Sequence, residues 1–227
     1  MRSAIVFDLD GTLIDSLPDI QNAMNTVLAP RGISALSLDE TNQFTGRGVD
    51  HLLMRVAETR DLASDAEREI KAAFLEAYET AFELTKPYPG VTEALAKLKS
   101  EGHRIGLCTN KPSKPAIAVL QAVGLLSFFD TMICGDSLTS RKPDPEPLVA
   151  AFTALGECRG LYVGDSEVDA DTAEAAQIPF ALFTEGYLKN PLATIRRHAT
   201  FNSFHELPRI FDDFLREQQS QAGSSWP

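Results

Sequence analysis

Cysteine and histidine are scarce in this chain of 227 residues, which contains three of the first and four of the second. The cysteines, Cys108, Cys134 and Cys158, lie far apart, with no CxxC pair and no histidine at the spacing of a metal site. Cys108 and Cys134 lie within apolar runs, which predicts buried, inert thiols. These absences argue against a disulfide framework and against a zinc site.

Long apolar stretches are also missing, since no run approaches the roughly 20 residues of a membrane span. The first residues, MRSAIVFDLD, contain an apolar run that is too short for a signal peptide, and charges follow at once. We therefore expect a cytoplasmic protein with no membrane partner.

Positive charge is in deficit, because 21 Lys and Arg face 32 Asp and Glu, for a net charge of −11. Nucleic acids and anionic membranes are bound by basic patches, so we expect neither as a partner. A small anionic substrate stays compatible with this composition if positive charge is concentrated locally. The sequence leaves monomer and dimer both open.

The hydrophobic pattern divides the chain into two parts. Residues 3–9 predict a buried strand, whereas residues 16–85 show helical spacing without a convincing strand. The segment KPYPG, residues 86–90, ends this helical block. Beyond it, strand and helix signals alternate. The predicted strands are 104–108, 131–134, 160–163 and 179–183, and the predicted helices are 92–101, 115–123, 145–155, 168–177 and 205–216.

Such alternation is typical of βαβ units and a parallel sheet. We therefore predict an α/β fold with a Rossmann-like, doubly wound, mainly parallel sheet. Residues 1–15 and 86–218 form this core, residues 16–85 form an inserted all-helical cap, and residues 219–227 form a disordered tail. The linkers near Ser16 and Lys86 are the expected hinges of cap closure.

The stretch VFDLDGTLIDS places Asp8 and Asp10 at the end of the first strand. Alternate side chains of a strand share a face, so the two carboxylates point the same way. They repel each other unless a cation lies between them or one of them holds a proton.

Ligands of a doubly wound sheet bind at the carboxyl ends of its strands. The other strand ends carry a hydroxyl, an amide, lysines and further acids: Thr109, Asn110, Lys111, Lys142, Asp165 and Asp169. Converging carboxylates favour Mg²⁺, and Lys142 and the Thr109 hydroxyl suit phosphate oxygens. Because no Ser-His-Asp arrangement competes, a carboxylate is the expected nucleophile.

Four segments, DLDGTLIDS, CTNK, RKPDP and VGDSEVD, stand in the order of the four motifs of the haloacid dehalogenase superfamily, which this sequence resembles. The helical block resembles the C1-type cap of that superfamily. The similarity is closest to the phosphoglycolate phosphatases and covers nearly the whole chain. It implies a Mg²⁺-dependent phosphomonoesterase acting on 2-phosphoglycolate.

The resemblance also implies a role for each motif residue. Asp8 attacks phosphorus to give an aspartyl-phosphate, and Asp10 protonates the leaving group and then activates water. The phosphate-binding residues are Thr109, Asn110 and Lys142. The implied metal ligands are Asp8, Asp10 through its backbone carbonyl, Asp165 and, in support, Asp169.

Three loop residues have a structural interpretation beside a functional one. Asn110 could orient the phosphate or only shape its loop. We expect Lys111 to be solvated rather than catalytic. Arg47, between two glycines of the cap, could bind a substrate carboxylate or face solvent.

Two helix starts raise the same question. Asp169 could simply stabilise a helix N-terminus through its negative charge. We expect Asp15 and Ser16 to cap the first cap helix, with Asp19 completing a capping box.

Other functions stay open. A phosphatase for sugar phosphates or pyrophosphate would need the same core motifs. A phosphomutase is less favoured, Asp10 disfavours dehalogenation, and a carbon–phosphorus hydrolase would need a cap lysine, of which there is only Lys71. A non-catalytic relative that binds a phosphometabolite is disfavoured because the four main motif residues are all present.

Overall fold

The structure is a computed structural model that describes residues 3–156 and 160–223. Cys158 and the last residues of the predicted tail lie outside these ranges. Six parallel strands form a sheet in the order β5-β4-β1-β6-β7-β8. Their bounds are β1 (Ala4–Phe7), β4 (Arg104–Cys108), β5 (Thr131–Ile133), β6 (Gly160–Gly164), β7 (Phe180–Phe183) and β8 (Ala199–Phe201). This order is doubly wound and confirms the predicted fold class.

The central strand β1 contributes to a hydrophobic layer on each face of the sheet. Ile5 and Phe7 belong to one buried cluster, and Ala4 and Val6 belong to the other. Because neighbouring side chains of a strand point to opposite faces, a short run that is apolar at every position is typical of a strand covered on both sides. Each large side chain buried in this way contributes about 1.5–3 kcal/mol.

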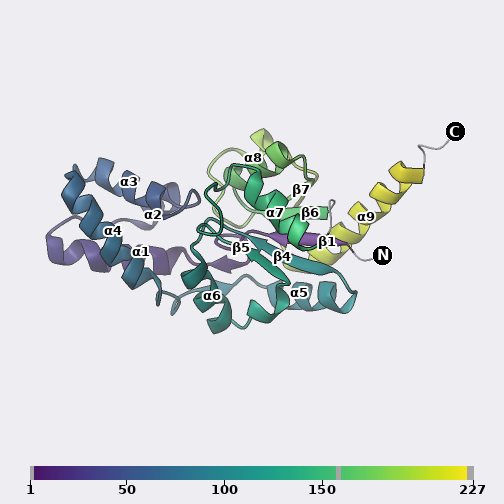
Figure 1. The fold of residues 1–227 in the computed structure, drawn as a ribbon, viewed down its shortest axis with the longest axis horizontal. Helices are drawn as coiled ribbons and strands as arrows, with labels where there is room; N and C mark the ends of the chain where they lie inside the picture. Colours follow the sequence, from purple (N-terminus) through teal and green to yellow (C-terminus); the bar gives the residue numbers. More distant parts are fainter. Residues whose placement is uncertain (1–2, 157–159, 224–227) are drawn as a thin grey trace.

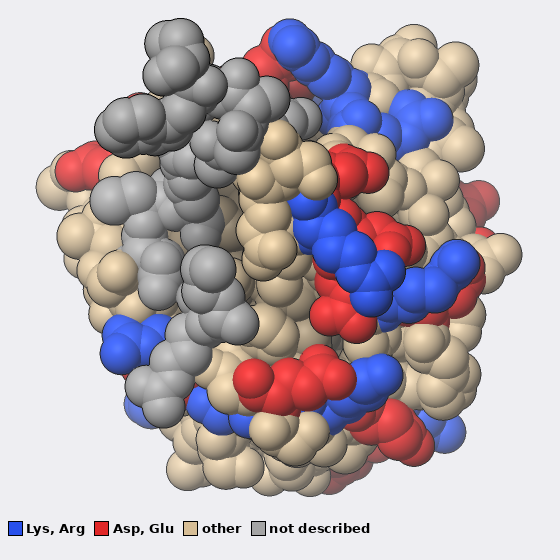
Figure 2. All heavy atoms as spheres, turned by 90° about the vertical axis from the view of Figure 1, so that its right-hand side faces the viewer, with Lys and Arg blue, Asp and Glu red and all other residues tan. Residues whose placement is uncertain are grey.

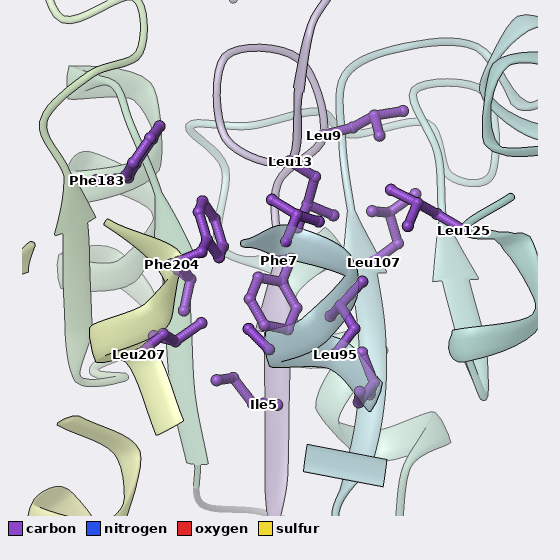
Figure 3. Close-up of a cluster of buried hydrophobic side chains, with 14 of the residues drawn as sticks. Ile5, Phe7, Leu9, Leu13, Leu95, Leu107, Leu125, Phe183, Phe204 and Leu207 are labelled. Carbon is purple, nitrogen blue, oxygen red and sulfur yellow. The ribbon is translucent and has the colours of Figure 1, made fainter. Parts of the chain in front are cut away.

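Helices cover both faces of the sheet (Figure 1). Figure 3 shows Phe7 in the middle of the first cluster, with Leu107 on one side and Phe204 on the other. The helices of that face are α5 (Val91–Ser100), α6 (Ser113–Ala122) and α9 (Leu207–Gly223), and those of the opposite face are α7 (Glu146–Ala154) and α8 (Glu167–Ala176). Both faces of the sheet are thereby withdrawn from water, and its carboxyl edge is left for a site.

A group of helices stands beside the sheet (Figure 1). These helices are α1 (Leu17–Leu28), α2 (Leu38–Phe44), α3 (Val49–Thr59) and α4 (Ser64–Tyr78). They bury a hydrophobic cluster of their own, whose fully buried members all fall between Ile20 and Tyr78 in the sequence. This cluster is separate from the two clusters of the sheet. We refer below to the sheet with its helices as the core and to this helical group as the cap; the exact domain bounds stay a prediction.

The two chain crossings between core and cap lie side by side. They form the antiparallel pair β2 (Ile14–Asp15) and β3 (Lys86–Pro87). The sequence did not predict this pair, because two residues carry no periodic signal. The pairing holds both predicted hinges at one place.

The start of α1 differs from the predicted capping box. The Ser16 side chain makes no capping hydrogen bond and instead donates to Asp10 at 2.5 Å. The Asp19 carboxylate accepts from Leu84 and Thr85. The predicted capping role of Asp15, Ser16 and Asp19 is therefore wrong. The Ser16 side chain binds Asp10 of the core, and the Asp19 side chain binds the segment just before the second crossing.

The ends of the other predicted core elements agree with the structure to within about two residues, with two exceptions. The last helix begins at Leu207 and continues to Gly223, so residues 219–223 are helical rather than a disordered tail. Strand β8 was not predicted. Short 3₁₀ turns complete the described fold: η1 (Ala29–Arg31), η2 (Leu126–Phe128), η3 (Leu192–Thr194) and η4 (Phe204–Glu206).

Among residues 3–156 and 160–223, no helix combines the length and the apolar character needed to cross a bilayer. On the face shown in Figure 2, Lys and Arg lie interspersed with Asp and Glu. On the described part of that face, positive charge is not gathered into one continuous patch.

Candidate active site

The candidate site lies where the strand order reverses. Strands β1 and β6 are neighbours, and the chain continues outward from each of them in opposite directions. Asp8 follows β1 and Asp165 follows β6, so both acids stand at the carboxyl edge of this switch point, where doubly wound folds bind ligands. Oxygens of Asp8, Asp165 and Asp169 lie within 4.8 Å of one another, and all three residues are buried.

Lys142 brings a buried positive charge to this cluster. Its Nζ lies 2.8 Å from Asp8 Oδ1 and 2.6 Å from Asp169 Oδ1, and it donates to the Tyr162 hydroxyl. Burial alone would lower the pKa of Lys142, but the carboxylates of Asp169 and Asp8 raise it above its usual range. The lysine is therefore a permanent cation beside Asp8.

Asp165 is held by the loop that follows the first strand. Its Oδ1 accepts from the Thr12 hydroxyl at 2.7 Å, and its Oδ2 accepts from the Tyr187 backbone N–H at 2.6 Å. Gly11 has a φ of +88°, and a Cβ at this position would overlap the Asp165 carboxylate. The Gly-Thr of the first motif is thus explained, because glycine leaves space for Asp165 and threonine orients it.

Asp169 is bound at both of its oxygens. Oδ1 accepts from Lys142 and from the Tyr162 hydroxyl, each at 2.6 Å, while Oδ2 accepts from the Ser166 hydroxyl at 2.6 Å in a capping box at the start of α8. Burial would raise the pKa of Asp169, but Lys142 and these hydrogen bonds lower it. Asp169 therefore stands in the capping box of α8 and orients Lys142 in the site, while its predicted support of a metal stays a prediction.

The donor set suits a divalent cation. Burial raises the pKa of Asp8 to about 7 even though Lys142 opposes it, and burial together with Asp169 and Asp8 raises the pKa of Asp165 well above its usual value. The cluster has more buried carboxylates than Lys142 can neutralise. Two or three carboxylate oxygens at one point fit Mg²⁺, which completes its coordination with water and substrate oxygens.

Asp10 lies beside this cluster with one oxygen engaged. Its Oδ1 accepts from the Ser16 hydroxyl at 2.5 Å and from Lys111 Nζ at 3.0 Å. Within the described part of the chain, no hydrogen bond reaches Oδ2. One carboxylate oxygen is thus fixed by the hinge and by Lys111, and the other is available to exchange a proton with a substrate.

Thr109 and Asn110 have different roles in the loop after β4. Thr109 lines the cavity above Asp8. The Asn110 amide donates to the Lys142 carbonyl at 2.9 Å and accepts from the Lys142 N–H at 3.0 Å, and it also donates to Gly46 of the cap at 3.1 Å. Both ends of this side chain are therefore used to hold the Lys142 loop and to contact the cap.

A cavity of about 50 Å³ lies between the core and the cap. Asp8, Asp10 and Thr109 line it from the core, and helices α1, α3 and α4 line it from the cap. One water needs about 10–15 Å³ on this measure, so this cavity, which is partly open to solvent, has room for a small molecule.

Lys111 lies in the cavity, whereas Arg47 lies outside it. Lys111 was expected in solvent, but its side chain is only 2% exposed and lines the cavity, so this expectation is wrong. Arg47 is exposed and does not line the cavity. Burial of Lys111 depends on the docked cap, which no local pattern around residue 111 reveals.

Sequence reasoning also missed two tyrosines of the site. Tyr162 binds Asp169 and Lys142. The Tyr187 hydroxyl accepts from the Ser16 and Leu17 N–H groups at 2.8 and 2.9 Å, so this residue connects the first hinge to Asp165. Tyr187 ends the segment FTEGY, which belongs to the stretches that carry the resemblance, and this was the available signal.

Comparisons with known proteins agree with this geometry. Residues 5–183 match the family model described as haloacid dehalogenase-like hydrolase. A phosphoglycolate phosphatase from Cereibacter sphaeroides is 50% identical over 93% of this chain and 98% of its own. A crystal structure from Haemophilus somnus 129PT, described as a predicted phosphoglycolate phosphatase, is 30% identical, with a TM-score of 0.88 over 92% of this chain and 97% of its own.

A more distant structure shares the fold. CbbY from Rhodobacter sphaeroides, solved in complex with phosphate, is 22% identical, with a TM-score of 0.76 over 91% of this chain and 96% of its own. At this identity the likeness concerns architecture alone.

Proposed function

Because the chain belongs to the haloacid dehalogenase-like hydrolase family, we propose that it is a Mg²⁺-dependent phosphomonoesterase that converts 2-phosphoglycolate to glycolate and phosphate. The substrate assignment is supported by relatives of 44–50% identity that are phosphoglycolate phosphatases. The observation that carries the chemistry is the placement of Lys142 Nζ 2.8 Å from Asp8 Oδ1, beside two further buried acids.

Asp8 is the proposed nucleophile. Its carboxylate attacks phosphorus, the bond from phosphorus to the glycolate oxygen breaks, and an aspartyl-phosphate forms. Lys142 favours the ionised form of Asp8 and, with the Thr109 hydroxyl, binds the phosphoryl oxygens. Asn110 serves this step by fixing the backbone of Lys142.

Asp10 is the proposed acid and base. It gives a proton to the departing glycolate oxygen and then takes one from the water that attacks the aspartyl-phosphate, which releases inorganic phosphate and restores Asp8. The free Oδ2 suits this exchange, because the hydrogen bonds of Ser16 and Lys111 fix Oδ1.

Mg²⁺ would be held by the side chains of Asp8 and Asp165 and by the backbone carbonyl of Asp10. Once bound, it neutralises charge on the phosphoryl group and on the acids around it. In this proposal Asp169 does not bind the ion directly, because both of its oxygens already accept short hydrogen bonds. It orients Lys142 instead.

The cap is proposed to exclude water during the reaction. Contacts from the core to the cap already include Asn110 with Gly46 at 3.1 Å and Lys189 Nζ with the Thr45 carbonyl at 2.6 Å. Opening about the β2–β3 pair would admit substrate, and closure would complete the site.

We place the enzyme in the cytoplasm, which the free, buried thiols of Cys108 and Cys134 support.

Phosphate release from a panel of phosphomonoesters tests the proposal. The panel contains 2-phosphoglycolate, hexose and pentose phosphates, pyrophosphate and a nucleotide, each with Mg²⁺ and with EDTA. Metal-dependent kcat/KM that is highest for 2-phosphoglycolate is the expected result. Preference for a sugar phosphate or for pyrophosphate would overturn the substrate, and silence across the panel would favour a non-catalytic phosphometabolite-binding protein.

A further inference from the structure

Lys111 and Tyr78 form a polar pair inside an otherwise apolar part of the cavity. Lys111 comes from the core loop after β4, and Tyr78 is the last residue of cap helix α4. Lys111 Nζ donates to the Tyr78 hydroxyl and lies 4.2 Å from the centre of its ring. The two side chains therefore meet across the boundary between core and cap.

The position of this pair suits contact with the leaving group of the substrate rather than with its phosphoryl group. Lys142 is shared between two acids, Asp8 and Asp169, and does not line the cavity. Lys111 is the one cationic side chain among the described residues that line the cavity. The part of a substrate that extends from the phosphoryl group toward the cap thus meets the ammonium group of Lys111.

The charge of Lys111 is only partly compensated. Its charged partner is Asp10, 3.0 Å away, and its other partner is a phenol. Asp10 Oδ1 also accepts from the Ser16 hydroxyl, so Lys111 shares this acceptor. An ammonium group has three N–H donors, and among the described residues Asp10 and Tyr78 use two of them. The third is left for an anion that the substrate delivers.

Tyr78 is suited to help bind such an anion. Burial and the nearby Asp10 raise the pKa of Tyr78 to about 12, so its hydroxyl keeps its proton at neutral pH. The oxygen accepts from Lys111, and the proton remains available for an acceptor. Lys111 and Tyr78 can therefore donate to the same group.

We propose that Lys111 and Tyr78 bind a carboxylate on the leaving group and so select short phosphorylated acids over neutral phosphate esters. This inference rests on the proposed phosphatase function and takes over the role considered for Arg47, which is exposed. Apart from Thr45, the large side chains of the remaining cap wall are apolar, among them Ile20, Leu52 and Phe74. Hydroxyl groups of a sugar would find few partners against it.

The test compares two substrates that differ in the carboxylate. We would measure kcat/KM for 2-phosphoglycolate and for ethyl phosphate in wild type, Lys111→Met and Tyr78→Phe. The ratio of the two values is expected to fall about 10- to 100-fold in Lys111→Met, because a charge-assisted pair is lost. It is expected to fall less in Tyr78→Phe, which keeps the ring but loses the hydroxyl.

Lys114→Met is the matched control. Lys114 also reaches from the core to the end of α4, pairing with Glu79 at 2.6 Å, but its side chain is 73% exposed. This variant loses the same charge at the same boundary outside the cavity, and its ratio is expected to equal that of wild type.

Each other outcome is decisive. If Lys111→Met lowers kcat/KM for both substrates equally, the lysine acts only through Asp10 and the inference is wrong. If the ratio does not move in either cavity variant, the inference is also wrong, while the phosphatase function stands. If the wild-type protein hydrolyses neither substrate, the proposed phosphatase function is wrong, and the inference that rests on it is wrong as well.

Discussion

The carboxylate of Asp19, in the first helix of the cap, accepts hydrogen bonds from both the backbone N–H and the hydroxyl of Thr85, at 2.7 and 2.6 Å. Thr85 lies on the chain segment that returns to the core, 66 residues further along the sequence. The Leu84 N–H donates to the same carboxylate. Asp19 thus links the segment of the chain that has just left the core to the segment that is about to return to it, next to the predicted hinges.

Replacing this acid should weaken the protein. In Asp19→Asn the N–H groups of Leu84 and Thr85 lose their shared carboxylate, and we expect the free energy of unfolding to fall by about 1–3 kcal/mol. Urea denaturation measures the change. Asp39→Asn, at an exposed position in the first turn of α2, serves as the control and should stay within about 1 kcal/mol of wild type. Equal stabilities for the two variants would contradict the assigned role of Asp19.

Asp10 gives a prediction that depends on the leaving group. Asp10→Asn cannot transfer a proton, and kcat for 2-phosphoglycolate should fall about 10²- to 10⁴-fold. With p-nitrophenyl phosphate the leaving group needs no proton, so formation of the aspartyl-phosphate should be much less affected. A pre-steady-state burst of p-nitrophenol measures that step. A first step slowed equally for both substrates would argue against Asp10 as the acid.

Metal binding can be measured without turnover. Mg²⁺ should raise the Tm of the wild-type protein, because an ion held by Asp8 and Asp165 stabilises only the folded state, by about 2.7 kcal/mol at 100 times its Kd. Asp165→Asn should remove most of this shift. Asp171→Asn, an exposed position of the neighbouring helix α8, should keep it. A shift that survives in Asp165→Asn would place the ion elsewhere.

His103 makes stability depend on pH. It is buried against Phe211, and burial lowers its pKa below the usual 6.5. The unfolded chain therefore binds this proton at a higher pH than the folded protein does, so the contribution of His103 to the free energy of unfolding should decline as pH falls below about 6.5. His103→Gln should decline less steeply between pH 7 and 5 in urea titrations. His205→Gln, at an exposed site, should follow wild type; identical slopes for all three proteins would rule out His103 as the cause.

The sequence predicted those features that depend on local patterns. Strand β1 is apolar at every position, which predicts a buried strand. Four acids and two lysines follow the predicted strands, so the main candidate site residues could also be inferred before the structure. β8 (Ala199–Phe201) buries only Phe201 and gives too short a signal. The α8 capping box and the site role of Asp169 proved compatible, since its two oxygens serve different partners.

The features that were missed depend on contacts between distant segments. Lys111 is buried because Tyr78 closes over it from the cap, and Asp19 is buried because residues 84 and 85 return beside it. Neither neighbour is visible from the residues on either side of Lys111 or Asp19. A solvated lysine and a capping acid were reasonable local expectations, and the packing of cap against core overrides both.

The role of Asp8 is the central claim, and Asp8→Asn tests it most directly. Asparagine keeps the shape of the side chain but cannot attack phosphorus, so phosphate release from 2-phosphoglycolate should fall by at least about 10³-fold. The Tm should be preserved, and binding of inorganic phosphate, followed by calorimetry, should persist. Turnover near the wild-type rate in a folded Asp8→Asn protein would contradict the account.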